Sequence, residues 1–264
     1  MLRLFLYLFL SALVYFGGLK PASCQSNIEL EDKLEQAITP EDSLDYLIQL
    51  TLAYRYKAPK QGIQYGEYAI LLGEKIKDSR LLARANTALG NVYYEKGEFG
   101  LALEAYSHAL NRCIIQYDNM FVASCLNNIG KVYRELGFYS LANVKFEQAI
   151  EIQNEENDNS GLAISYLNLG VTHLKMKDYD QAMQSFNTIL DTPFDELDPL
   201  IRATTFKNVG NIFLQRGEYP MATEFYDRAF RIYERLEDQK GLASIYNRLG
   251  LCNKLKADYP AALE

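Results

Sequence analysis

The chain has 264 residues, a formal net charge of −7 and an isoelectric point near 5.1. Apolar residues make up 48% and charged residues 23%, a composition typical of globular proteins and not of disordered ones. Proteins that bind nucleic acid usually place an excess of positive charge against the phosphates, so the acidic balance argues against DNA or RNA as a partner.

The first 24 residues are predicted to be a signal peptide that is removed from the mature chain. After a basic start, residues 4–16 form a 13-residue apolar run, which is too short to cross a bilayer comfortably. Small residues then precede a cleavage point after Cys24. The alternatives are an uncleaved membrane anchor and an acylated Cys24, although Pro21 does not suit the lipoprotein pattern. Cleavage takes the net charge from −7 to −9 because two basic residues are lost.

Residues 25–82 predict an N-terminal helix followed by a first, divergent helical unit. We expect a short helix at 28–38 and a helix pair at 40–57 and 60–77. Thr39, followed by a proline and two acids, has the form of a helix start, because the hydroxyl can cap free N–H groups and acids favour the positive helix end.

A repeat of 40 residues organises the rest of the chain. The doublet of an aliphatic residue and glycine recurs at this step, as do an alanine, a ring, a second alanine and a second ring, beginning at Ala83, Phe99, Ala102 and Tyr106. The repeat divides the chain into 83–122, 123–162, 163–202, 203–242 and an incomplete unit at 243–264.

Each unit is predicted to hold two helices, at 83–96 and 99–116 in the first full repeat. Gly137 and Gly217 fall at the break between helices, where a left-handed residue often ends a helix. The small residues of the doublet and of the second alanine column are expected to let the two helices approach closely. Acidic and amide residues such as Asp118 mark the turns between units.

These repeats resemble the tetratricopeptide repeat. The resemblance rests on Leu89-Gly90-x-x-Tyr93, on Gly97-x-Phe99-x-x-Ala102 and on Tyr106-x-x-Ala109. It covers about residues 43–264, and the period of 40 is similar to the long-helix branch seen in kinesin light chains and bacterial peptide-sensing regulators. It implies an all-α fold, a right-handed superhelical solenoid of antiparallel helix pairs, and a protein- or peptide-binding function.

No pattern of residues indicates catalysis, a cofactor or a metal. His173 replaces a ring in the Tyr93 column and is expected to be a packed aromatic substitute. The acid-rich turns lack the alternating ligands and central glycine of a calcium loop. After cleavage three cysteines remain; Cys113 and Cys125 lie on either side of one turn, and their pairing in an oxidising compartment is left open.

The resemblance places a ligand on the concave side of the array, which the first helix of each pair lines. Amides there suit an extended peptide backbone, because they both donate and accept hydrogen bonds. The cations Arg84, Lys131, Arg134, Lys207, Arg248 and Lys254 occupy this side without an acid among them, which predicts an acidic peptide or a C-terminal carboxylate as ligand. The predicted binding residues are Asn91, Asn127, Asn128, Lys131, Arg134, Asn168, Lys207, Asn208, Asn211 and Arg248.

We therefore expect an exported, periplasmic or otherwise extracytoplasmic binding protein that is not an enzyme. The final unit stops within its second helix, so we expect a longer regulatory protein of which this is the sensor or interaction part. Contact with a membrane would come only from the leader or from a segment beyond residue 264. The alternative is a free scaffold that assembles proteins of the cell envelope.

Overall fold

The computed structural model describes residues 25–116, 118–193 and 197–258, so the expected leader and the last six residues lie outside it. Every regular element within these ranges is an α-helix, and none of them is long and apolar enough to cross a membrane. The helices are α2 (Gln25–Gln36), α3 (Pro40–Tyr54), α4 (Pro59–Ile76), α5 (Ser79–Glu95), α6 (Phe99–Gln116), α7 (Asn119–Glu135), α8 (Tyr139–Glu155), α9 (Asn159–Met176), α10 (Tyr179–Leu190), α11 (Pro199–Gln215), α12 (Tyr219–Arg235) and α13 (Gln239–Asp258).

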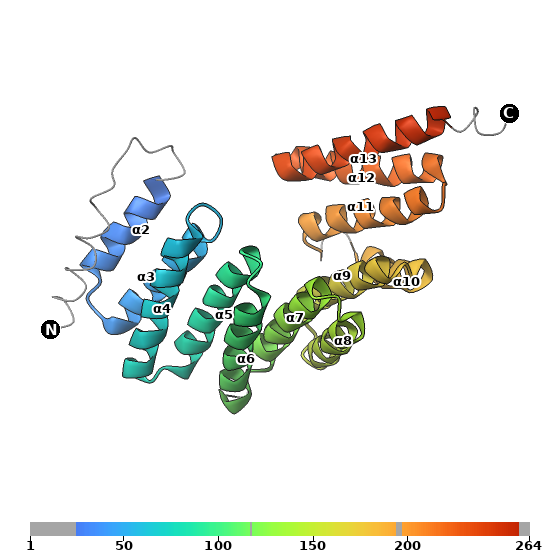
Figure 1. Cartoon of the computed structure of the whole chain (residues 1–264). Coiled ribbons are helices and arrows are strands. Elements are labelled where there is room, and N and C mark those ends of the chain that lie inside the picture. The colour runs from blue at the N-terminus through green and yellow to red at the C-terminus, as the bar shows by residue number, and fades with distance from the viewer. Residues whose placement is uncertain (1–24, 117, 194–196, 259–264) are drawn as a thin grey trace.

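Successive helices pack on one another in pairs and form an all-α repeat solenoid, as predicted (Figure 1). The pairs are α3 with α4, α5 with α6, α7 with α8, α9 with α10 and α11 with α12, and α13 follows them. The helices follow an arc, and the start of α13 faces the connection between α3 and α4 (Figure 1). Among the described residues no single core runs through the array; each pair shares a core with the next one, as in other stacked repeats.

Side-chain caps explain where the helices start. Thr39 caps α3 as expected, and its hydroxyl accepts a hydrogen bond from the Asp42 N–H at 3.0 Å. The first helices of the full repeats start four residues earlier than 83 and its equivalents, because Asp78, Asp118 and Asp158 each accept a hydrogen bond from the backbone three residues on.

The glycine of each doublet makes room for a ring, which is a more specific reason than the close helix approach that we expected. A Cβ on Gly130 would lie 2.5 Å from Cε1 of Phe146, and one on Gly90 would lie 2.7 Å from Cε1 of Tyr106. Gly170 and Gly210 meet rings in the same way. The ring in the Tyr106 column thus packs against the glycine of the first helix of its own unit, and it is fully buried.

The breaks between paired helices use left-handed residues, as predicted. Gly97, Gly137 and Gly217 have φ angles of 76°, 82° and 76°. Lys177 stands in the same column and adopts a φ of 61°, a conformation that costs a side chain more than it costs glycine. The fold therefore imposes the turn even where the sequence departs from glycine.

Candidate functional site

Side chains from distant units approach one another on one face of the array. Arg55, which ends α3, lies within electrostatic reach of Lys131 on α7, two units further along. Lys240, in the first turn of α13, places its Nζ 5.3 Å from the centre of the Tyr56 ring. The array therefore curves towards the face that carries Arg55, Lys131 and Lys207, and we call it the concave surface.

Lys131 and Arg55 form a first cationic cluster beside Tyr94. The Nζ of Lys131 lies 5.5 Å from the centre of the Tyr94 ring. Burial lowers the pKa of Lys131, and Arg134 and Arg55 lower it further, whereas Glu95 acts in the opposite direction. Within the described part of the chain Lys131 makes no ion pair, so its positive charge is not neutralised by a direct contact.

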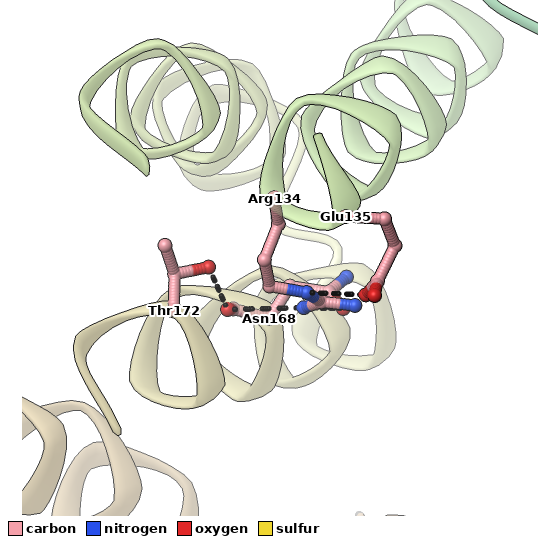
Figure 2. A network of polar contacts seen from close by, with 4 residues as sticks. All are labelled: Arg134, Glu135, Asn168 and Thr172. Carbon is pink, nitrogen blue, oxygen red and sulfur yellow. Dashed lines mark hydrogen bonds and ion pairs between the residues drawn. The ribbon is translucent and has the colours of Figure 1, made fainter. Parts of the chain in front are cut away.

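Arg134 is held in place by its neighbours (Figure 2). Its Nε lies 3.3 Å from a carboxylate oxygen of Glu135, and its Nη1 donates to the carbonyl oxygen and the side-chain oxygen of Asn168, each at 3.4 Å. The Thr172 hydroxyl donates to the same Asn168 carbonyl at 2.8 Å. Because its side chain is only 9% exposed, Arg134 ties α7 to α9 and offers little charge to a ligand.

Lys207 on α11 and Arg248 on α13 form a second cationic cluster. Burial lowers the pKa of Lys207, the Arg248 charge lowers it further, and Asp238 opposes both. Neither cation makes an ion pair with any residue that the structure describes. By contrast, Arg84 pairs with Asp45 at 2.8 Å, so this cation of the predicted set is compensated.

Two of the predicted asparagines are buried between helices. Asn127 is 5% exposed, donates to the Ser165 hydroxyl at 2.7 Å and accepts from Asn168 at 3.3 Å. Ser165 in turn bonds the Gln153 amide at 2.6 Å, so the network joins α7, α8 and α9. Asn208 is 8% exposed and accepts from Asn211. Asn128 is half-buried on α7. A ligand contact at these positions stays a prediction.

Asn91 and Asn211 satisfy buried tyrosine hydroxyls. Tyr106 donates to Asn91 at 2.8 Å and Tyr226 donates to Asn211 at 2.9 Å. In the units between them the ring column holds phenylalanine, and the asparagine column holds Lys131 and then a valine. This pairing of tyrosine with asparagine is a signal in the sequence that separates packing asparagines from accessible ones.

Arg55 and Lys240 were not predicted as members of the surface, because Arg55 lies in the divergent unit and Lys240 precedes the predicted start of the last unit at residue 243. Tyr54 and Tyr56 also lie outside the repeat columns. Of these, Tyr54 stacks on Tyr65 at 5.7 Å between ring centres and bonds Glu31, so it packs within the first unit. Tyr56 is 57% exposed and lies on the concave surface.

No catalytic arrangement is found among residues 25–116, 118–193 and 197–258. His173 lies 3.9 Å from the Asp178 carboxylate and is otherwise packed against its neighbours, with its side chain 14% exposed. No group of three potential metal-ligating side chains converges among these described residues. Cys113 and Cys125 are buried free thiols that touch each other.

The tetratricopeptide repeat model matches residues 81–155, 121–192 and 201–264, which is more than half of the chain. None of the curated proteins matches the sequence.

Solved structures with the same fold include BtubC from P. vanneervenii, at 21% identity over 83% of this chain and 94% of that one, with a TM-score of 0.69. A Rap protein complexed with competence and sporulation factor has 18% identity over 86% of this chain and 68% of that one, with a TM-score of 0.62. NprR in complex with its cognate peptide NprX has 18% identity over 89% of this chain and 66% of that one, with a TM-score of 0.63. At these identities the likeness is one of fold.

Proposed function

Because the chain belongs to the tetratricopeptide repeat family, we propose that it is a protein- or peptide-binding module and not an enzyme. Its ligand is an extended acidic segment, or a C-terminal carboxylate, that lies along the concave surface. Lys131 and Arg55 hold one part of the ligand, and Lys207 and Arg248 hold another.

The observation that carries this proposal is the distribution of charge. A chain of net charge −7 gathers two clusters of cations on one face, and Lys131 and Lys207 are partly withdrawn from water. Surroundings of low polarity strengthen the field of such charges and attract anions. The complex of NprR with its cognate peptide, in a protein that shares the fold, is consistent with a peptide ligand.

A peptide-library pull-down at two ionic strengths tests the function. We expect acidic sequences to be enriched among the bound peptides at low salt. This enrichment should fall at high salt, because exposed charge pairs are screened. The variant carrying Lys131→Glu and Lys207→Glu should lose this enrichment. A matched control with Lys75→Glu and Arg112→Glu makes the same charge change at exposed positions on second helices and should behave as the native chain. Bound peptides without an acidic bias would refute the proposal.

We further propose that the module works outside the cytoplasmic membrane as the sensor or interaction part of a longer regulatory protein. The basic start and short apolar run of the first 24 residues support export. N-terminal sequencing of the protein from the cell envelope should find Gln25 first. A free scaffold of the cell envelope is the alternative, and the two differ in whether the gene continues beyond residue 264 into an apolar span of about 20 residues.

A further inference from the structure

The first and last parts of the array meet at the Tyr56 ring. Arg55 lies over this ring, with its guanidinium carbon 4.6 Å from the ring centre, and Lys240 lies 5.3 Å from the same centre. The Tyr56 hydroxyl donates to a carboxylate oxygen of Glu95 at 3.2 Å. Tyr56 follows α3, whereas Lys240 belongs to α13, so the contact joins elements that the solenoid separates by nine helices.

This contact is small and polar. Both Tyr56 and Lys240 are exposed, and a cation–π contact at an exposed site shifts an equilibrium by roughly two- to fivefold. Such a contact is strong enough to favour a closed arrangement but too weak to hold it permanently. Arg55 and Lys240 also carry like charges on the same ring, so an anion between them would strengthen the closure.

The contact lies beside both cationic clusters. Arg55 interacts with Lys131 of the first cluster. Lys240 follows Asp238, which acts on Lys207 of the second cluster and caps the backbone N–H of Lys240 at 3.1 Å. Closure therefore joins the two ends of the concave surface beside the residues that would bind an anionic ligand.

We propose that Tyr56 and Lys240 form a clasp that closes the concave surface over its ligand, and that the ligand is a flexible anionic peptide and not a folded protein. The inference rests on the proposed function for the nature of the ligand. A flexible peptide can pass one end into the closed array, or it can enter while the clasp is open and be enclosed when the clasp closes. A folded partner would instead keep Tyr56 and Lys240 apart.

A first experiment tests the clasp without any ligand. In the full chain, Tyr56→Cys with Lys240→Cys should be joined within one molecule by a short bis-maleimide, which adds to both thiols. The matched control combines Tyr56→Cys with Ser160→Cys, an exposed position 80 residues before Lys240 that has the same place in its repeat. The native cysteines, Cys24 and the buried Cys113, Cys125 and Cys252, are common to both variants. Equal cross-linking in the two variants would overturn the proposal.

A second experiment uses the cross-linked protein and the best acidic peptide from the library. We expect the cross-linked protein to bind the linear peptide. It should not bind the same peptide placed between two folded carrier domains, because neither blocked end can pass the closed clasp. The same variant without cross-linker should bind both forms. Equal binding of the doubly flanked peptide before and after cross-linking would overturn the proposal. If no peptide binds the open form, the proposed function fails, and the cross-linking yield still decides whether the clasp exists.

Discussion

Two neighbouring junctions of the array, between α8 and α9 and between α10 and α11, are filled in different ways. At the first, α8 runs to Glu155, and Gln153, Ser165 and Asn127 form a buried polar network. At the second, α10 ends at Leu190 and packs less extensively on the helix that follows. The repeat thus fixes the packing within a helix pair more strictly than the packing between pairs.

The second junction depends on one arginine. Arg202 is 7% exposed and donates to the carbonyl oxygens of Thr192 at 2.8 Å and Pro193 at 3.1 Å, beyond the end of α10. The other units hold aliphatic residues in its column, at Leu82, Val122, Leu162 and Leu242. A charged side chain therefore replaces part of the missing helix. Because this junction lies between Lys131 and Lys207, it also sets the spacing of the two cationic clusters.

Of the substitutions at these junctions, removal of Arg202 should lower the stability of the chain most. We expect Arg202→Ala to lower the free energy of unfolding by about 3 kcal/mol, because two backbone carbonyls lose the charged donor that the buried Arg202 supplies. Urea denaturation measures the loss, and hydrogen exchange should rise first in α10 and the start of α11. Arg202→Leu, which restores the aliphatic residue of this column, should lose less stability than Arg202→Ala. A loss of exchange protection confined to α8 and α9 would contradict the role given to Arg202.

The polar junction can be broken at Ser165. Ser165→Ala should destabilise the chain by about 1.5 kcal/mol, because the Gln153 amide and the Asn127 amide each lose a buried partner. Thr205 stands one repeat later, and its hydroxyl donates to the Ile201 carbonyl of its own helix at 2.8 Å. Thr205→Ser, which keeps that hydroxyl, is the control and should change thermal stability less; equal losses would show that the network contributes nothing special.

The turn after α9 offers a smaller, stabilising change. Lys177→Gly should raise the free energy of unfolding by about 1 kcal/mol, because glycine adopts the φ of 61° without the steric cost of a side chain. Lys175→Gly, inside the same helix, should lower it by about 1 kcal/mol instead. Thermal unfolding of both variants shows whether each substitution raises or lowers stability. A loss of stability in Lys177→Gly would contradict the strain assigned to this turn.

The sequence predicted the helices well because their signals are local. Thr39, the Asp118 turn and the recurring glycines each act within a few residues, so their positions mark helix ends directly. The concave surface was predicted only in part, because curvature brings Arg55 and Lys240 to it from outside the repeat columns. The role of Arg202 could not be predicted either, since it compensates for a helix end that the 40-residue period does not reveal.

Binding should also respond to pH. Because burial and neighbouring cations lower the pKa of Lys131 from 10.5, its charge is lost at a lower pH than that of an ordinary lysine. Affinity for an acidic peptide should therefore fall as pH rises, before pH 10.5 is reached. The same shift makes burial of charged Lys131 unfavourable, so its contribution to folding stability should rise with pH over that window. Lys131→Arg should keep affinity to higher pH, which fluorescence anisotropy can follow.

The most direct measurement is a titration of the best acidic library peptide against the native chain and against Lys131→Gln with Lys207→Gln, each at low and high salt. We predict that the native chain binds the peptide and that its affinity falls at high salt. The double variant should bind weakly at both salt concentrations, while its thermal unfolding stays cooperative. Equal affinity of the two proteins, with the same dependence on salt, would contradict a ligand held by the two cationic clusters.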